Sequence, residues 1–129
     1  MSFATRREAI DACMTFPGVY EAYPFDDANW TVMRHGSNHR VFAMIYEHLG
    51  GLWMNVKAEP LAVRLWQQIF PAVVPAYHMN KDHWVSIVLD GSMKDEEIMR
   101  LIADSYHLTM PKQGTKKAPK GLEEAKDQD

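Results

Sequence analysis

Hydrophobic positions recur at helical spacing in three stretches of the chain. In the first stretch, Ile10 and Cys13 follow Thr5-Arg6-Arg7-Glu8, which has the form of a capping box, and Pro17-Gly18 ends the helix. The second stretch begins at Glu59-Pro60, and its apolar stripe comprises Leu61, Ala62, Leu65, Trp66 and Ile69. The third follows Ser92-Met93-Lys94-Asp95, and its apolar positions are Ile98, Leu101, Ile102 and Tyr106. The pattern therefore predicts three amphipathic helices.

Runs of β-forming residues lie between these helices. Three of them, Trp30 to Arg34, Val41 to Glu47 and Leu52 to Lys57, are separated by turn residues at 36–38 and 50–51. In the third run, Leu52, Met54 and Val56 alternate with Trp53, Asn55 and Lys57, so one face of the sheet is aliphatic and the other is polar. After the second helix, residues 75–79 and 84–89 predict two more strands.

The predicted order of elements is helix, three strands, helix, two strands, helix. Helices that pack against a mainly antiparallel sheet define an α+β fold, and residues 1–110 suffice for one such domain. Residues 111–129 contain only one large apolar side chain, Leu122. Such a segment buries too little apolar surface to offset its ordering entropy, so the sequence predicts a disordered polar tail.

The charge is unevenly distributed along the chain. Residues 1–110 carry nine basic and thirteen acidic side chains, a net charge of −4, whereas the whole chain has a formal charge of −3. Residues 111–120 contain no acid and four lysines, Lys112, Lys116, Lys117 and Lys120. An acidic domain binds nucleic acid only where its basic groups gather on one surface, so their location matters more than their number.

Motifs that support enzymatic or metal chemistry are missing from the sequence. A single cysteine excludes a disulfide framework and a cysteine-based zinc site, and no histidine pair has the His-Glu-x-x-His form. The chain also lacks a Gly-x-Ser-x-Gly elbow and a phosphate-binding loop. No apolar run reaches the length of about 18 residues that a membrane helix needs. We therefore expect a cytoplasmic protein that is not an enzyme, has no metal or other cofactor and has no membrane partner.

The segment from Pro75 to Trp84 has the highest density of polar and aromatic side chains. It contains Tyr77, His78, Asn80, Lys81 and His83. These residue types suit phosphate neutralisation and base stacking. They also suit a tight turn with residues 80–82 at its tip and aromatic rings that anchor the sheet. Composition leaves both interpretations open.

Several short motifs occur in the order found in one known family. They are Pro17-Gly18, Tyr20-Glu21, Tyr23-Pro24-Phe25, Asn55-Val56-Lys57 with Glu59-Pro60, Tyr77-His78-Met79-Asn80-Lys81 with His83-Trp84, Leu89-Asp90-Gly91-Ser92 and Ser105-Tyr106. In this order they resemble the MmcQ/YjbR family over residues 5 to 110. The resemblance implies a YjbR-like, CyaY-like or secretion-chaperone-like fold with the same order of elements. It also implies DNA binding through a double-wing arrangement of hairpins.

The first functional hypothesis is therefore a module that binds duplex DNA through two wings. One wing is the hairpin at residues 34–40, and the other is the turn at residues 80–82. Phosphate contacts dominate affinity for duplex DNA, so basic groups at the wings are the main candidates. The candidate DNA-binding residues are Arg34, His39, Arg40, Lys57, His78, Asn80, Lys81 and Trp84. The four tail lysines would add a further electrostatic contact.

Two alternatives remain open from the sequence. The first is a protein- or peptide-binding module, or a homodimer, that uses Trp53, Met44 and Tyr46 as an adaptable apolar surface. The exposure of these three side chains decides whether such a surface exists. The second alternative is a small-molecule or enzymatic pocket, whose lining would be His78, His83, Asn55 and Lys57.

Overall fold

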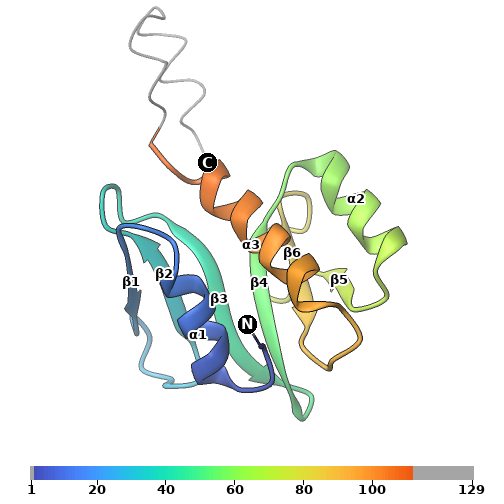
Figure 1. Ribbon diagram of the computed structural model, residues 1–129, viewed down its shortest axis with the longest axis horizontal. Helices are drawn as coiled ribbons and strands as arrows, with labels where there is room; N and C mark the ends of the chain where they lie inside the picture. Colours follow the sequence, from blue (N-terminus) through green and yellow to red (C-terminus); the bar gives the residue numbers. More distant parts are fainter. Residues whose placement is uncertain (1, 112–129) are drawn as a thin grey trace, which may run out of the picture.

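The sheet and the helices form two layers. The computed structural model describes residues 2–111, in which helices α1 (Arg6–Met14), α2 (Pro60–Ile69) and α3 (Asp95–Leu108) lie on one face of an antiparallel sheet (Figure 1). The sheet has six strands in the order β1-β2-β3-β4-β6-β5. These strands are β1 (Val19–Ala22), β2 (Thr31–His35), β3 (Val41–His48), β4 (Gly51–Lys57), β5 (Val73–Pro75) and β6 (Trp84–Val88). The predicted α+β class is confirmed.

One strand was not predicted, so the expected three strands before the second helix are in fact four. Strand β1 pairs with β2 at the edge of the sheet, with Val19 opposite His35. Its four residues show no clear alternation, and residues 23–30 separate it from the strand with which it pairs. Close approach of the backbones depends on Gly36, whose N–H donates to the Gly18 carbonyl over 2.6 Å. A Cβ at position 36 would lie only 2.9 Å from that oxygen, so glycine is required there.

The starts of two helices test the predicted caps. Thr5 caps α1 as expected: its hydroxyl accepts from the Glu8 N–H, and the Glu8 carboxylate accepts from the Thr5 N–H. Helix α3 begins at Asp95, and its N-cap residue is Lys94, within the predicted segment 92–95. The backbone N–H of Ser92 donates to the Asp90 carboxylate in the preceding turn.

The hydrophobic core lies between the sheet and the three helices. Met54 and Val56 of β4 are fully buried there, as the alternation predicted. A β-bulge brings two consecutive β3 residues into the same core, because Met33 pairs with Ala43 while Arg34 pairs with Val41, which leaves Phe42 without a partner. Phe42 and Ala43 are both fully buried. No helix among residues 2–111 is long and apolar enough to cross a bilayer. The predicted tail lies outside the described residues except for Pro111.

Hydrogen bonds connect the end of α3 to the hairpin between β2 and β3. The His35 Nε2 atom lies 2.7 Å from the Thr109 hydroxyl, and the Asn38 amide donates to the Thr109 carbonyl over 2.9 Å. His35 is only 2% exposed and its ring packs against Tyr106. Burial lowers the pKa of His35 below its ordinary value of 6.5, and the positive charges of Arg40 and His107 act in the same direction. His35 is therefore neutral in the folded state at physiological pH.

This burial predicts a loss of stability in mild acid. As the pH falls below about 6.5, the unfolded chain takes up a proton at His35 before the folded chain does, so the free energy of unfolding decreases. Urea denaturation from about pH 7.5 to about pH 5.5 measures the effect. In the variant His35→Gln we expect lower stability at neutral pH but a flatter dependence on pH. A variant with the same slope as the parent would contradict this assignment.

Candidate functional site

Both predicted wings lie at the same end of the sheet. Arg34 pairs with Val41 at the β2–β3 turn, and Lys57 pairs with Trp84 where β6 begins after the second turn. In the order β2-β3-β4-β6, Lys57 on β4 therefore lies between the two turns. The last residues of α3 reach this end as well, through the contacts of Thr109 described above. We call this region, which comprises residues 34–41, 57–59, 80–84 and 109–111, the wing end.

The first wing is held by its own polar side chains. The Arg34 guanidinium donates to the His39 carbonyl over 2.8 Å, and the Asn38 side chain accepts from the Arg40 N–H over 3.0 Å. His39 has a φ of 63°, in the left-handed region, and its Nδ1 atom lies 2.9 Å from the Tyr20 hydroxyl. Arg34 and His39 therefore have a structural role in the turn, whatever else they contact.

The second wing is a turn built by Asn80. Its side-chain oxygen accepts from the Asp82 N–H over 2.8 Å, and its carbonyl accepts from the His83 N–H. The His83 carbonyl accepts from the Ala58 N–H, which ties the turn to the end of β4. Lys81 lies at the tip and is exposed. The turn interpretation thus accounts for Asn80, and Lys81 is the basic residue that this wing presents to solvent, next to the exposed Asp82 and His83.

Charge is segregated between the two ends of the sheet. The segments of the wing end carry more bases than acids, namely Arg34, Arg40, Lys57 and Lys81 against Glu59 and Asp82. The opposite end comprises the loop before β2, the β3–β4 turn and the start of α3 (Figure 1). Its segments carry more acids than bases, namely Asp26, Asp27, Glu47, Asp90, Asp95, Glu96 and Glu97 against Lys94. The start of α1 also lies here, because Arg6 donates to the Asn29 and Ile45 carbonyls, and it adds Arg6, Arg7 and Glu8 without removing the acidic surplus. The acidic surplus of the domain therefore lies away from the wings.

The sheet face that carries no helix, which we call the open face, has a buried polar network at its centre. The Asn55 side-chain oxygen accepts from the hydroxyls of Tyr46 and Ser86, and its amide donates to the Tyr77 carbonyl over 2.9 Å. The Ser86 hydroxyl also accepts from the Tyr77 N–H over 2.9 Å. Burial raises the pKa of Tyr46 to about 12, so this hydroxyl remains a donor. The network fixes the segment after β5 onto the sheet.

Aromatic rings cover this network. Tyr77 stacks on His48 with ring centroids 3.9 Å apart, and Trp30 stacks on Tyr46 at 4.2 Å. His78 has a φ of 62° and lies against Trp30 and Tyr77 over the open face, away from the wing tip. The apolar surface predicted for Trp53, Met44 and Tyr46 is therefore reduced, because Tyr46 is fully buried and the other two side chains are half-buried.

An apolar cavity of about 310 Å³ remains beside this aromatic cluster. Its lining consists of Phe25, Asp27, Trp30, Met44, His78 and Met79. Of the four residues predicted to line a small-molecule pocket, only His78 is found here. Asn55 is sealed beneath Tyr77, whereas Lys57 and His83 lie at the wing end. The structure does not bring the four together.

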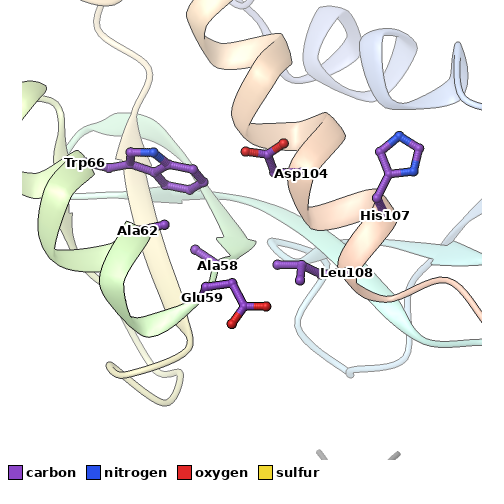
Figure 2. A pocket seen from close by; sticks show the side chains of 7 residues that line it. All are labelled: Ala58, Glu59, Ala62, Trp66, Asp104, His107 and Leu108. Atoms are coloured by element: carbon purple, nitrogen blue, oxygen red, sulfur yellow. The ribbon is translucent and has the colours of Figure 1, made fainter. Parts of the chain in front are cut away.

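A groove between α2 and α3 is the feature that sequence reasoning missed. The groove has two sections, one near the start of α2 and one near its end, and Trp66 lines both. In the first section, the α3 residues Asp104 and Leu108 form part of the wall opposite α2 (Figure 2). On α2, Leu61, Leu65 and Ile69 are 77%, 51% and 54% exposed, and Leu65 and Ile69 line the groove. The spacing predicted an apolar stripe on the second helix, and much of that stripe is exposed. In fact Val63 is the only residue of α2 that is buried.

Metal-ligating side chains do not gather into a metal centre in the part of the chain that the structure describes. Among residues 2–111 no three His, Cys, Asp or Glu side chains are placed to hold a metal ion. Cys13 is fully buried on α1, and desolvation raises the pKa of its thiol to about 12. Its neutral thiol behaves as a small hydrophobic core residue.

These features define an α+β domain with helices on one face of its sheet and an aromatic cluster on the other. Residues 14–108 match the family model YjbR, and the chain belongs to that family. It is 32% identical to the uncharacterised protein YbdF of Escherichia coli O157:H7 over 97 residues, which cover 75% of this chain and 77% of YbdF. It is 36% identical to the uncharacterised protein YyaQ of Bacillus subtilis over 101 residues, which cover 70% of this chain and 80% of YyaQ.

Solved structures share the fold over nearly the same region. A crystal structure of a Pseudomonas syringae protein has a TM-score of 0.75 and 27% identity, and the match covers 82% of this chain and 99% of that protein. The crystal structure of Deinococcus radiodurans protein DR2400 also has a TM-score of 0.75, with 29% identity, and the match covers 95% of this chain and 88% of DR2400.

The buried network makes a quantitative prediction about Asn55. The variant Asn55→Ala leaves the Tyr77 carbonyl without its side-chain donor and removes the shared acceptor of the Tyr46 and Ser86 hydroxyls, which then have each other at 3.1 Å, so we expect a loss of about 3 kcal/mol in the free energy of unfolding. The variant Tyr46→Phe removes one donor only and should cost about 1 kcal/mol. Urea denaturation measures both. Equal costs for the two variants would show that Asn55 is not the centre of the network.

Proposed function

We propose that the protein binds duplex DNA through the wing end. One observation carries the proposal: the register of the sheet puts both turns at the same end, with Lys57 between them. Basic side chains outnumber acidic ones on these segments, whereas the acids of α3 begin at the opposite end. A surface of this kind attracts phosphate even though residues 1–110 are acidic as a whole.

The proposed contacts divide by chemistry. Lys81 at the exposed tip of the second wing, together with Arg34, Arg40 and Lys57, would neutralise phosphates. Trp84, half-buried and paired with Lys57, would pack against a sugar or base. Asn80 and His39 would act through the shape of their turns. The chain leaves the described residues at this same end, and the sequence that follows carries four more lysines.

A second candidate function, protein binding, is supported by a separate surface. Leu61, Leu65 and Ile69 of α2 are exposed, and two of them, Leu65 and Ile69, line a groove together with Trp66 and Phe70. This surface replaces Trp53, Met44 and Tyr46 as the candidate site for a protein partner or for a second copy of the chain. The two functions use different elements, so each is tested separately.

A titration with labelled duplex DNA tests the DNA proposal. We expect binding to a duplex of about 20 base pairs that weakens steeply between about 50 and about 200 mM KCl. The variant Lys81→Ala should weaken binding to all sequences alike and lower the salt slope by about 1. Fluorescence anisotropy with the full chain measures both quantities.

The matched control is Lys94→Ala, which removes one exposed lysine from the acidic end. It should leave the affinity and the salt slope unchanged. The proposal fails if no binding occurs at low salt, or if the two lysine variants weaken binding equally.

A further inference from the structure

The α2–α3 groove consists of two hollows between these helices, and Trp66 lines both of them. Its section near the start of α2 is lined by Ala58, Glu59, Ala62, Trp66, Asp104, His107 and Leu108, and has a volume of about 310 Å³ (Figure 2). Its section near the end of α2 is lined by Leu65, Trp66, Ile69, Phe70, Glu96, Glu97, Arg100 and Leu101, and has a volume of about 330 Å³. The ten residues of α2 span about 15 Å, which is enough to contact several turns of another helix.

The apolar part of the groove has the geometry of a helix-binding site. Leu61, Leu65 and Ile69 are spaced four residues apart and so form one ridge along α2. Trp66, half-buried, lies between this ridge and α3. A groove with an aromatic side chain at its centre and an aliphatic edge accepts the apolar face of an amphipathic helix. Covering it would remove from water the largest aliphatic side chains that α2 exposes.

The polar part of the groove determines the charge of its ligand. Glu59 and Asp104 come from opposite walls of one section, and Asp104 lies beside the Trp66 ring (Figure 2). Glu96 and Glu97 line the other section, together with Arg100. Carboxylates next to an indole ring favour a lysine or arginine, through charge attraction and a cation–π contact. Nucleic acid is disfavoured here by the same carboxylates.

We propose that the α2–α3 groove binds an amphipathic helix of a partner protein, with an apolar stripe of leucine-like residues flanked by lysines or arginines. The proposal rests on the second candidate function and is independent of DNA binding. A second copy of the chain fits less well, because a two-fold pairing of this surface would bring Glu59, Glu96, Glu97 and Asp104 of both copies close together.

A pair of synthetic helices tests the proposal on the full chain. The probe is a fluorescein-labelled Leu/Lys peptide, LKKLLKLLKKLLKL, and its counterpart LEELLELLEELLEL has glutamate in place of every lysine. We expect the lysine peptide to bind and the glutamate peptide to bind at least about tenfold more weakly. The double variant Glu59→Gln, Asp104→Asn should reduce affinity for the lysine peptide and its dependence on salt.

Two leucine variants distinguish binding in the groove from non-specific hydrophobic association. Leu65→Asp places a charge at the centre of the ridge and should weaken binding of the lysine peptide at least about tenfold. The matched control is Leu49→Asp, because Leu49 is 82% exposed on the distant β3–β4 turn. It should bind like the parent. Both sites are on the surface, and circular dichroism confirms that both variants fold.

Three results would overturn the proposal. The first is equal binding of the lysine and glutamate peptides, and the second is an equal effect of the two leucine variants. The third is self-association in sedimentation equilibrium that Leu65→Asp abolishes, which would assign the groove to a second copy. Duplex DNA titrated in parallel keeps the two functions apart: Leu65→Asp should leave DNA affinity unchanged, and Lys81→Ala should leave peptide affinity unchanged.

Discussion

The architecture depends on how a wide sheet covers the face that has no helix. Asn55 holds a covering segment on that face. Its side chain accepts from two hydroxyls of neighbouring strands and donates to the backbone of the segment after β5. That segment brings Tyr77 over the sheet, where it stacks on His48. A buried polar network of this kind stabilises only when every member has its partner, and the described residues contain no buried side-chain polar atom without one. The second wing begins where this segment turns back, so its position follows from the same network.

The fold also explains how an acidic domain presents a basic surface. In an antiparallel sheet every connecting turn lies at one of two ends. Charged residues that are far apart in the sequence therefore come together at one end or the other. Arg34 and Lys81 are far apart in sequence, yet the strand order places them on either side of Lys57. The acids at the start of α3 are brought to the opposite end, where they also favour the positive end of the helix dipole. The position of these acids therefore both stabilises α3 and separates the acidic end of the sheet from the wing end.

Much of this could be predicted from local pattern. The capping box at Thr5, the alternation along β4 and the α+β class follow from spacing alone. Strand β1 could not be predicted, because its pairing depends on β2 and on the close approach at Gly36. The exposure of the α2 stripe could not be predicted either, because periodicity identifies an apolar face without saying what covers it. The Tyr77–Trp84 motif has a similar limit: its residue types fitted both a binding segment and an anchored turn, and only the contacts of Asn55 and Asn80 reveal the anchoring.

The two edge strands determine how this domain can associate with other chains. Strand β1 has four residues and is followed by Pro24, and β5 has three residues and ends with Pro75, which lacks an N–H. Edges this short and interrupted by proline are poor templates for an added strand. β-augmentation and fibre-like extension are therefore disfavoured at both edges of the sheet. The edges restrict association by added strands, and the surface left for the proposed protein contacts is the helical layer.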